Sequence, residues 1–401
     1  MLYANLTPAP ADSILGLTEA YKKDVNPKKV NLGVGVYMDE RGRTPILQAV
    51  KKAEKILLDT QDTKTYLPIA GAPEYGQVVQ ELLFGADSVK KDGGRMRTAH
   101  TPGGTGGLRI GAEFLRKVAP KATVWLSSPT WANHKGIFAA AGFKTSDYPY
   151  YDPASHGIDF SGLTACLDKI PEGDIVLLHV CCHNPTGVDL SAEQWSEVIR
   201  IAQARRWIPF LDFAYQGFGV GVEEDGAILK PLLATGLEFF ISSSFSKNFG
   251  LYQERVGALT LVAGDTAAVE AAFSHVKATI RVVYSNPSAH GGAIVTTILR
   301  DDALRSLWRS ELDAMRERIA AVRKDFVGQL HARGASMDFS YIEKQKGMFS
   351  FSGLSDAQVQ YLRDKKGIYM VAGGRINVAG ILPNNIGYLC ESVQEALQQA
   401  H

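Results

Sequence analysis

The sequence has little that would tie it to a nucleic acid or to a membrane surface. Among its 401 residues, 43 lysines and arginines face 42 aspartates and glutamates, which leaves a formal net charge of +1. This balance lacks the basic excess that binds polyanions and the acidic excess of a solvating tail. The longest uncharged stretches, such as residues 175–188, are interrupted by Asn184, Pro185 and Gly187 and are too short to cross a bilayer. We therefore expect neither a nucleic-acid partner nor a membrane partner.

Cysteine is also scarce. The four cysteines, Cys166, Cys181, Cys182 and Cys390, include no CxxC pair, so the sequence has no zinc-binding or redox motif of that kind. Reduced thiols in the cytoplasm are the simplest interpretation. The first 24 residues lack the cationic and apolar segments of a secretory signal. The sequence thus predicts a cytoplasmic protein without a metal.

Apolar residues, at 45% of the chain, are abundant enough for a sizeable core, and the length suits a large domain with a smaller one. The middle of the chain alternates short apolar runs with helical patterns such as residues 192–205. The expected strands are residues 123–127, 175–180, 208–212, 239–243 and 258–262. Strands separated by helices predict an α/β fold whose mainly parallel sheet is flanked by helices, with ligands at the carboxyl ends of the strands.

A long helix should follow this domain. Apolar residues recur in steps of three and four from Leu304 to Leu330, which predicts a helix over about residues 303–331. The short apolar runs 348–352 and 376–378 then indicate a smaller α+β domain. We expect a large domain over residues 46–314 and a small domain built from residues 12–45 and 315–401.

Two polar motifs follow predicted strands or precede predicted helices. Gly103, Gly104, Gly106 and Gly107 come just before a helical pattern, where backbone N–H groups could hold a phosphate. Their spacing matches neither a P-loop nor a dinucleotide fingerprint, and a plain flexible turn is the alternative. In the second motif, Cys-His-Asn-Pro-Thr-Gly, Asn184 offers a side-chain amide after a strand, unless the motif is only a turn.

Two further motifs carry charge. Asp212 ends an apolar run, where its carboxylate needs a partner if it is buried, although a helix cap is the common alternative. Lys247 lies in a serine-rich turn with Arg255 eight residues later, although a lone loop lysine is usually solvated. Pyridoxal 5′-phosphate needs a lysine for a Schiff base, an acid at its ring nitrogen and donors for its phosphate, and the four motifs together meet that need.

Long strings of the sequence carry a specific resemblance. They are NLGVGVYMDE, PTWANH, CCHNPTG, DFAYQGF, SFSKNFGLYQERVG, YSNP, GMFSFSGL and GGRINVAG. With these strings the chain resembles, nearly end to end, the class I, fold-type I pyridoxal-phosphate aminotransferases of the bacterial aspartate and aromatic-amino-acid subfamily. The resemblance implies a fold-type I transferase that passes the amino group of aspartate, tyrosine or phenylalanine to 2-oxoglutarate in a ping-pong reaction, giving the 2-oxo acid and L-glutamate.

The resemblance also implies a role for each residue around the cofactor ring. Lys247 forms the Schiff base and moves the substrate's proton, and Asp212 pairs with the ring nitrogen with His134 behind it. Tyr215 and Asn184 donate to the phenolic oxygen. Trp131 stacks on the ring. The cofactor phosphate is expected on Gly103, Gly104, Thr105, Ser244, Arg255 and, from a neighbouring subunit, Tyr66.

For the substrate, the resemblance implies that Arg375 binds the α-carboxylate, in a pocket shared with Gly35, Asn184 and Trp131. Arg281 would come from the other subunit and bind the distal carboxylate. Shared active sites imply a homodimer, and the first 11 residues are then expected to form an arm on the partner. Phe349 would line the entrance.

The preferred amino acid stays open between the two subfamilies. Gly103 matches the aromatic enzymes better, whereas Ser244, Asn248 and Ser285 match the aspartate enzymes, and Gly374 stands where serine is common.

Two other functions remain as alternatives. A fold-type I lyase or decarboxylase would share Lys247 and Asp212 but does not need both arginines, and a non-catalytic transaminase-like sensor would need a DNA-binding module for which the chain has no residues to spare.

Overall fold

The computed structural model describes residues 3–4, 6–7 and 15–399, and its chain forms two compact units. The large unit comprises Thr44–Ile319 and Gln345–Gly347, and the small unit comprises Met1–Arg43, Ala320–Lys344 and Met348–His401. The sequence placed the ends of the first small-domain segment and of the large domain at residues 45 and 314. In the structure the corresponding segments end at residues 43 and 319. Most of the expected N-terminal arm, including Pro8 and Pro10, lies outside the described residues.

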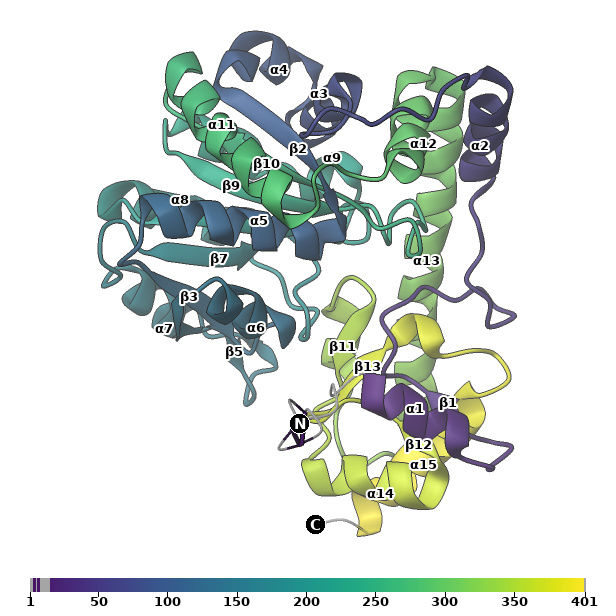
Figure 1. Ribbon diagram of the computed structural model, residues 1–401. Helices are drawn as coiled ribbons and strands as arrows, with labels where there is room; N and C mark the ends of the chain where they lie inside the picture. The colour runs from purple at the N-terminus through teal and green to yellow at the C-terminus, as the bar shows by residue number, and fades with distance from the viewer. Residues whose placement is uncertain (1–2, 5, 8–14, 400–401) are drawn as a thin grey trace. The chain divides into compact units, whose positions relative to one another are not determined.

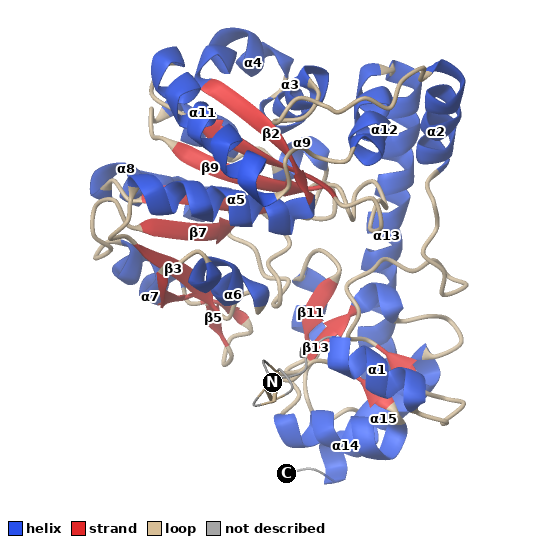
Figure 2. Cartoon of the chain, in the orientation of Figure 1, coloured by secondary structure: helices blue, strands red, loops and turns tan. Residues whose placement is uncertain are grey.

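A seven-stranded sheet forms the centre of the large unit (Figures 1 and 2), in the order β2-β10-β9-β8-β7-β3-β4. Its strands are β2 (Met96–Pro102), β3 (Thr123–Ser128), β4 (Lys144–Pro149), β7 (Ile175–His179), β8 (Ile208–Phe213), β9 (Phe239–Ser244) and β10 (Val256–Val262). Only β10 is antiparallel to its neighbours, so the other six strands run in one direction. Their carboxyl ends therefore meet at one edge of the sheet, where ligands bind in such folds.

Helices cover both faces of this sheet. The helices of the large unit are α2 (Gln48–Thr60), α3 (Pro73–Phe84), α4 (Ala86–Asp92), η1 (Gly93–Arg95), α5 (Gly103–Val118), α6 (Asn133–Ala140), α7 (Phe160–Leu167), α8 (Ala192–Arg205), α9 (Val222–Asp225), α10 (Leu229–Ala234), α11 (Thr266–Val283) and α12 (Ala289–Arg300). Helices α6 and α11 both contact α5, and α7 and α10 both contact α8. The crossovers reverse direction after β4, which places these two sets on opposite faces. The strands β5 (Tyr151–Asp152) and β6 (Gly157–Ile158) form a separate antiparallel hairpin.

The α/β fold with a mainly parallel sheet is confirmed, and each of the five expected strands forms. Helix α8 begins where the sequence predicted, because Ser191 and Gln194 make a capping box at its start. Strands β2 and β4 were not expected, since their sequences, MRTAHTP and KTSDYP, have no apolar run. In β2 the polar Thr98 is nevertheless buried, and its hydroxyl pairs with that of Thr260 on β10 at 2.9 Å.

Helix α5 packs unusually close to the sheet because of two glycines. A Cβ at Gly111 would lie 2.5 Å from the ring of Phe210 on β8, and one at Gly107 would lie 2.6 Å from Oγ of Ser242 on β9. Only glycine leaves room for this approach. The glycines expected before the helix thus lie within its first turns, and they set its N-terminus against the carboxyl edge of the sheet.

The small unit contains short sheets and several helices. Its elements are α1 (Leu15–Lys23), β1 (Val30–Asn31), η2 (Ser340–Lys344), β11 (Phe349–Phe351), α14 (Asp356–Lys366), β12 (Ile368–Tyr369), β13 (Arg375–Asn377), η3 (Val378–Gly380) and α15 (Ile386–Gln399). Strand β1 pairs with β12, so the N-terminal part joins this unit, and β11 pairs with β13. The long helix α13 (Asp302–Ala332) agrees with the expected 303–331 and begins in the large unit and ends in the small one. Among the described residues, no helix combines the length and apolar character that crossing a bilayer requires.

Candidate active site

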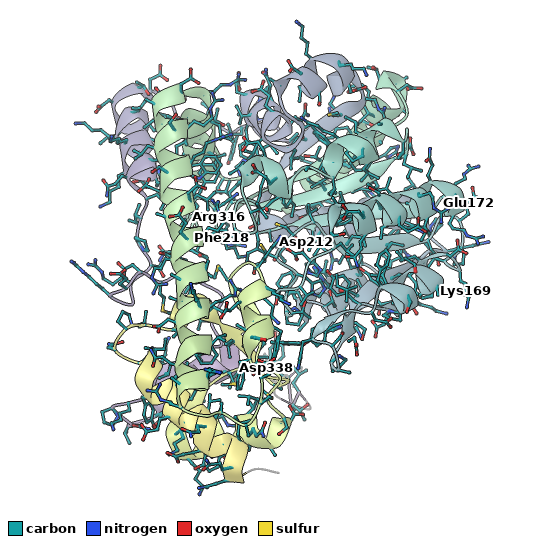
Figure 3. All side chains as sticks on the ribbon, turned by 180° about the vertical axis from the view of Figure 1, so that it is seen from behind. Lys169, Glu172, Asp212, Phe218, Arg316 and Asp338 are labelled. Atoms are coloured by element: carbon teal, nitrogen blue, oxygen red, sulfur yellow. The ribbon has the colours of Figure 1, made fainter. Side chains whose placement is uncertain are left out.

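A buried carboxylate occupies the carboxyl end of β8. Asp212 is aligned in register with His179 on β7 and Ser242 on β9, and it is 6% exposed. In Figure 3 it lies inside the large unit, whereas the exposed Lys169 and Glu172 lie at its rim. The sequence left a helix cap as the alternative role of Asp212, but the residue belongs to the strand and has a side-chain partner.

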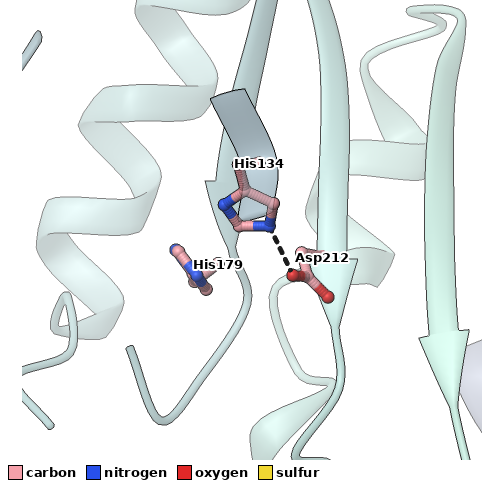
Figure 4. A group of neighbouring side chains, drawn as sticks. All are labelled: His134, His179 and Asp212. Carbon is pink, nitrogen blue, oxygen red and sulfur yellow. Dashed lines mark hydrogen bonds and ion pairs between the residues drawn. The ribbon is translucent and has the colours of Figure 1, made fainter. Parts of the chain in front are cut away.

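That partner is His134, at the start of α6. Its Nε2 lies 2.9 Å from Oδ2 of Asp212 (Figure 4). Its Nδ1 lies 2.8 Å from the hydroxyl of Thr130. Since a carboxylate only accepts, Nε2 donates to it. Burial alone would raise the pKa of Asp212, but the hydrogen bond and charge of His134, together with Lys247, outweigh burial and lower that pKa below its usual value. Asp212 is therefore held as an anion inside the protein.

The same edge holds a second histidine. Ligand atoms of His134, His179 and Asp212 all lie within 4.8 Å of one another, a grouping that could suit a metal ion. Both ring nitrogens of His134 already have hydrogen-bond partners, however, and a metal would have to replace the bond to Asp212. Burial lowers the pKa of His179 to about 3, so this ring is neutral. We therefore interpret His134 as a hydrogen-bond donor to the Asp212 carboxylate rather than as a metal ligand.

A lysine lies close to this carboxylate. Lys247 follows β9, and its Nζ is 4.9 Å from the centroid of the Tyr215 ring. The pKa of Lys247 is lowered to about 8, because burial, together with the charge of Arg255, lowers it more than the charge of Asp212 raises it. A large fraction of this amine is thus neutral just above physiological pH, as a nucleophile or base requires. The interpretation of Lys247 as a solvated loop lysine does not fit its burial.

An anion-binding cradle lies beside the lysine. Helix α5 begins at Gly103, whose N–H donates to the carbonyl of Arg255 at 2.9 Å. The helix has no side-chain cap and no acidic residue in its first turn, so its positive end and the N–H groups that follow Gly103 suit an anion. Gly103 has φ = +70°, and a Cβ there would collide with the guanidinium of Arg255. Arg255 also donates to Oγ of Ser246 at 3.2 Å, and that hydroxyl lies 3.3 Å from Ser244.

Of the residues expected around a phosphate, Gly103, Gly104, Ser244 and Arg255 are thus connected by contacts, and Thr105 follows in the first turn of α5. Oγ of Ser242 donates to the carbonyl of Gly104 at 2.8 Å. Ser246 was not predicted, although the serine-rich turn contained it.

The aromatic and amide groups expected at the ring also lie at this edge. The half-buried Trp131 sets its ring edge-on to His134, with centroids 5.1 Å apart. Tyr215 is buried after β8, and Asn184 is buried in the turn after β7. Trp131, Tyr215 and Asn184 therefore follow three strands that end at one edge.

Two other expected residues are exposed on this chain. Tyr66 is 91% exposed in the segment between α2 and α3. Arg281 is exposed near the end of α11, where it donates to the hydroxyl of Ser285. Neither has a contact here with the lysine or the cradle.

The expected carboxylate-binding arginine lies in the small unit. Arg375, 4% exposed, donates to the carbonyl of Gly33 at 2.8 Å, and its guanidinium carbon lies 4.2 Å from the centroid of Phe349. A Cβ at Gly35 would lie 3.1 Å from the same ring. Asn377, which sequence reasoning missed, donates to the carbonyls of Val34 and Val36 at 2.6 and 2.8 Å and so holds the loop that contains Gly35.

Comparisons with known proteins agree with this geometry. A family model described as aminotransferase class I and II matches residues 27–393. The chain is 52% identical to the aspartate aminotransferase of Escherichia coli (strain K12), over 99% of this chain and 100% of that one. It is 46% identical to the aromatic-amino-acid aminotransferase of the same organism, over 94% and 95% of the two chains.

A solved structure is equally similar. The aromatic-amino-acid aminotransferase of Burkholderia pseudomallei, covalently bound to pyridoxal phosphate, superposes with a TM-score of 0.96 at 48% identity, covering 99% of this chain and 100% of that one. The chain belongs to the class I and II aminotransferases.

Proposed function

We propose that this protein is a pyridoxal-phosphate-dependent transaminase that moves the amino group of aspartate, and of aromatic amino acids, to 2-oxoglutarate in a ping-pong reaction. The observation that carries the proposal is the buried lysine of depressed pKa beside a buried, histidine-bonded aspartate, next to an anion cradle. The similarity to both aspartate and aromatic enzymes supports the two substrate classes.

The residues present fit the cofactor. The open N-terminus of α5, with Arg255 and the serine hydroxyls, suits a phosphate dianion, because backbone N–H groups and a guanidinium both donate to it. Asp212 suits a protonated ring nitrogen, since it stays ionised although it is buried. When bound there, pyridoxal 5′-phosphate draws electrons away from the Cα–H bond of an attached amino acid.

Lys247 has two tasks in this proposal. Its Nζ would hold the cofactor covalently at rest. Once a substrate amine took that place, Nζ would be a free amine, and the burial that lowers its pKa would suit it to accept the Cα proton of the substrate. Its position over the face of Tyr215 restricts where the amine can reach.

Two arginines would select the substrate. The buried Arg375 offers a fork for the α-carboxylate, oriented by the Phe349 ring and the Gly33 carbonyl. Arg281 would bind a distal carboxylate in the active site of a second copy. Its exposure supports this, as does that of Tyr66, and Val282 and Val283 beside it are 82% and 52% exposed. We therefore propose a homodimer with shared sites, and the four free cysteines agree with a cytoplasmic setting.

A half-reaction tests the proposal. The protein is loaded with pyridoxal 5′-phosphate, and L-aspartate or L-phenylalanine is added without an oxo acid while the cofactor spectrum is followed. We expect the band of the lysine-bound cofactor to give way to that of the aminated cofactor, and 2-oxoglutarate to restore it. Lys247→Ala should abolish turnover, whereas Lys135→Ala, which removes an exposed lysine, should not. Ammonia or carbon dioxide release in place of reversible amination would favour a lyase or a decarboxylase.

A further inference from the structure

The turn after β7 is held by the carboxylate of Asp189, which lies at the end of the same turn. Oδ2 of Asp189 accepts the backbone N–H of Cys182 at 2.7 Å, and Oδ1 accepts that of His183 at 2.8 Å. Cys182 has φ = +53°, an unfavourable conformation for a residue with a Cβ, and the next residue but one is Asn184. The bonds to Asp189 thus fix the backbone immediately before this amide.

The turn after β8 is held in the same way. Oδ2 of Asp225 accepts the N–H groups of Gly217 and Gly219 at 2.8 and 2.9 Å, and Oδ1 accepts that of Val220 at 2.8 Å. Asp225 is 7% exposed, and the first of these donors lies two residues after Tyr215. These N–H groups lie beyond the end of β8, where no neighbouring strand offers a carbonyl oxygen. The carboxylate of Asp225 accepts their hydrogen bonds instead.

The two turns also contact each other. The thiol of Cys181 donates to the backbone carbonyl of Tyr215 at 3.5 Å. The segment Gln345–Gly347 of the large unit packs against the turn after β7. The N–H of Lys346 donates to the carbonyl of Gly187 at 2.7 Å, and Gly347 lies so close to Cys182 that a Cβ at this glycine would clash with it. Because of these contacts, a displacement of the turn after β7 would also displace the turn after β8, and the reverse.

We propose that Asp189 and Asp225 are positioning residues, which fix the two strand-end turns and thereby aim the donors that those turns carry. The inference rests on the proposed function, in which Asn184 and Tyr215 donate to the phenolic oxygen of the cofactor. Ionised carboxylates suit this task because charge-assisted bonds to several N–H groups are stronger and shorter than neutral ones.

The charges around Asp189 define the pH range for a test. The charges of Lys346 and Asp225 act on its carboxylate. The carboxylate acts in turn on the buried side chains of Tyr150 and Cys181, and burial raises the pKa of both groups well above the usual value, so both are uncharged near neutral pH. The pKa of Asp189 is raised to about 6, because burial and the charge of Asp225 raise it more than the two backbone hydrogen bonds and Lys346 lower it. Above this pH both oxygens accept, so the holoenzyme is to be titrated upward from there.

The expected direction follows from the phenolic oxygen. Donors on that oxygen draw its negative charge away from the proton of the neighbouring Schiff-base nitrogen, and so they lower the pKa of that nitrogen. If a turn loses its anchor, the donor weakens and the proton is held more tightly. In Asp189→Asn and in Asp225→Asn we expect the pKa read from the cofactor spectrum to rise by about 0.5 pH unit or more.

Asp152→Asn is the matched control. Its carboxylate also accepts two successive turn N–H groups, those of Ala154 and Ser155, but in the exposed hairpin between β5 and β6. This variant should titrate like the wild type. Asp189→Glu and Asp225→Glu keep the charge and both oxygens, and should shift the pKa in the same direction by less, which keeps the test decisive if an asparagine variant does not fold.

Two results would overturn the inference separately. If the anchor variants lose thermal stability but titrate like the wild type, the carboxylates are structural only, and the proposed function is untouched. If the wild type shows no cofactor band that titrates and that borohydride fixes on Lys247, the proposed function fails and this inference fails with it.

Discussion

Replacing the buried lysine by an uncharged side chain of similar length should stabilise the fold while destroying activity. The variant is Lys247→Met, studied after removal of the cofactor so that no covalent bond contributes. The pKa of this amine falls from 10.5 to about 8, chiefly because burial penalises the charged form. At neutral pH the folded protein therefore carries a charged group that the unfolded chain accommodates at less cost.

The size of the effect follows from the shift. About 2.5 pH units at 1.36 kcal/mol each correspond to roughly 3 kcal/mol at pH 7. The sign is fixed, because a lysine of depressed pKa destabilises the fold fully below its folded pKa, and this penalty disappears as the pH rises from about 8 toward 10.5. The wild type should gain stability over that range, whereas Lys247→Met should lack this gain.

Urea unfolding at one protein concentration measures both quantities. Unfolding is followed at pH 7 and at pH 10 for the wild type, for Lys247→Met and for Lys135→Met. The exposed Lys135, 54% accessible beside Asp147, should change the free energy of unfolding by no more than about 0.5 kcal/mol. If Lys247→Met is no more stable than the wild type at pH 7, or if the two differ equally at both pH values, burial does not set the pKa of this amine.

Three further outcomes are expected. Asp212→Asn should lower kcat by about 100-fold or more while the circular dichroism spectrum stays native, because the ring nitrogen loses its anion; a retained rate would contradict the role of Asp212. Arg281→Asp should reduce kcat/KM for aspartate far more than for phenylalanine, and equal losses would contradict a distal-carboxylate role. Mixing inactive Lys247→Ala with Arg281→Asp chains under exchange should restore about a quarter of the wild-type aspartate activity, since each hybrid dimer would hold one intact shared site; no recovery would place both residues in the site of one chain.

Local sequence patterns were enough to predict five strands and helix α8 of the large unit. The helix at 192–205 followed from its periodicity and its serine start, and the capping box of Ser191 and Gln194 is local chemistry. Strands β7 and β8 followed from apolar runs that are buried on both faces. The polar motifs were recognised because Asn184 follows β7, Asp212 lies near the end of β8 and Lys247 follows β9. Parallel strands end at one edge of a sheet, so these residues were expected together.

The tertiary structure decided what no local pattern contains. Strands β2 and β4 are polar, so only pairing with β10 and β3 makes them strands. The anchoring roles of Asp189, Asp225 and Asn377 depend on backbone N–H and C=O groups that only the folded turns present. The sequence by itself determined which chemical groups are available and at which strand ends. The contacts of Asp212 with His134 and Lys247 keep it ionised although burial opposes this, and burial lowers the pKa of Lys247. The tertiary structure decides both, because a pKa depends on the solvation and partners that only the packed protein provides.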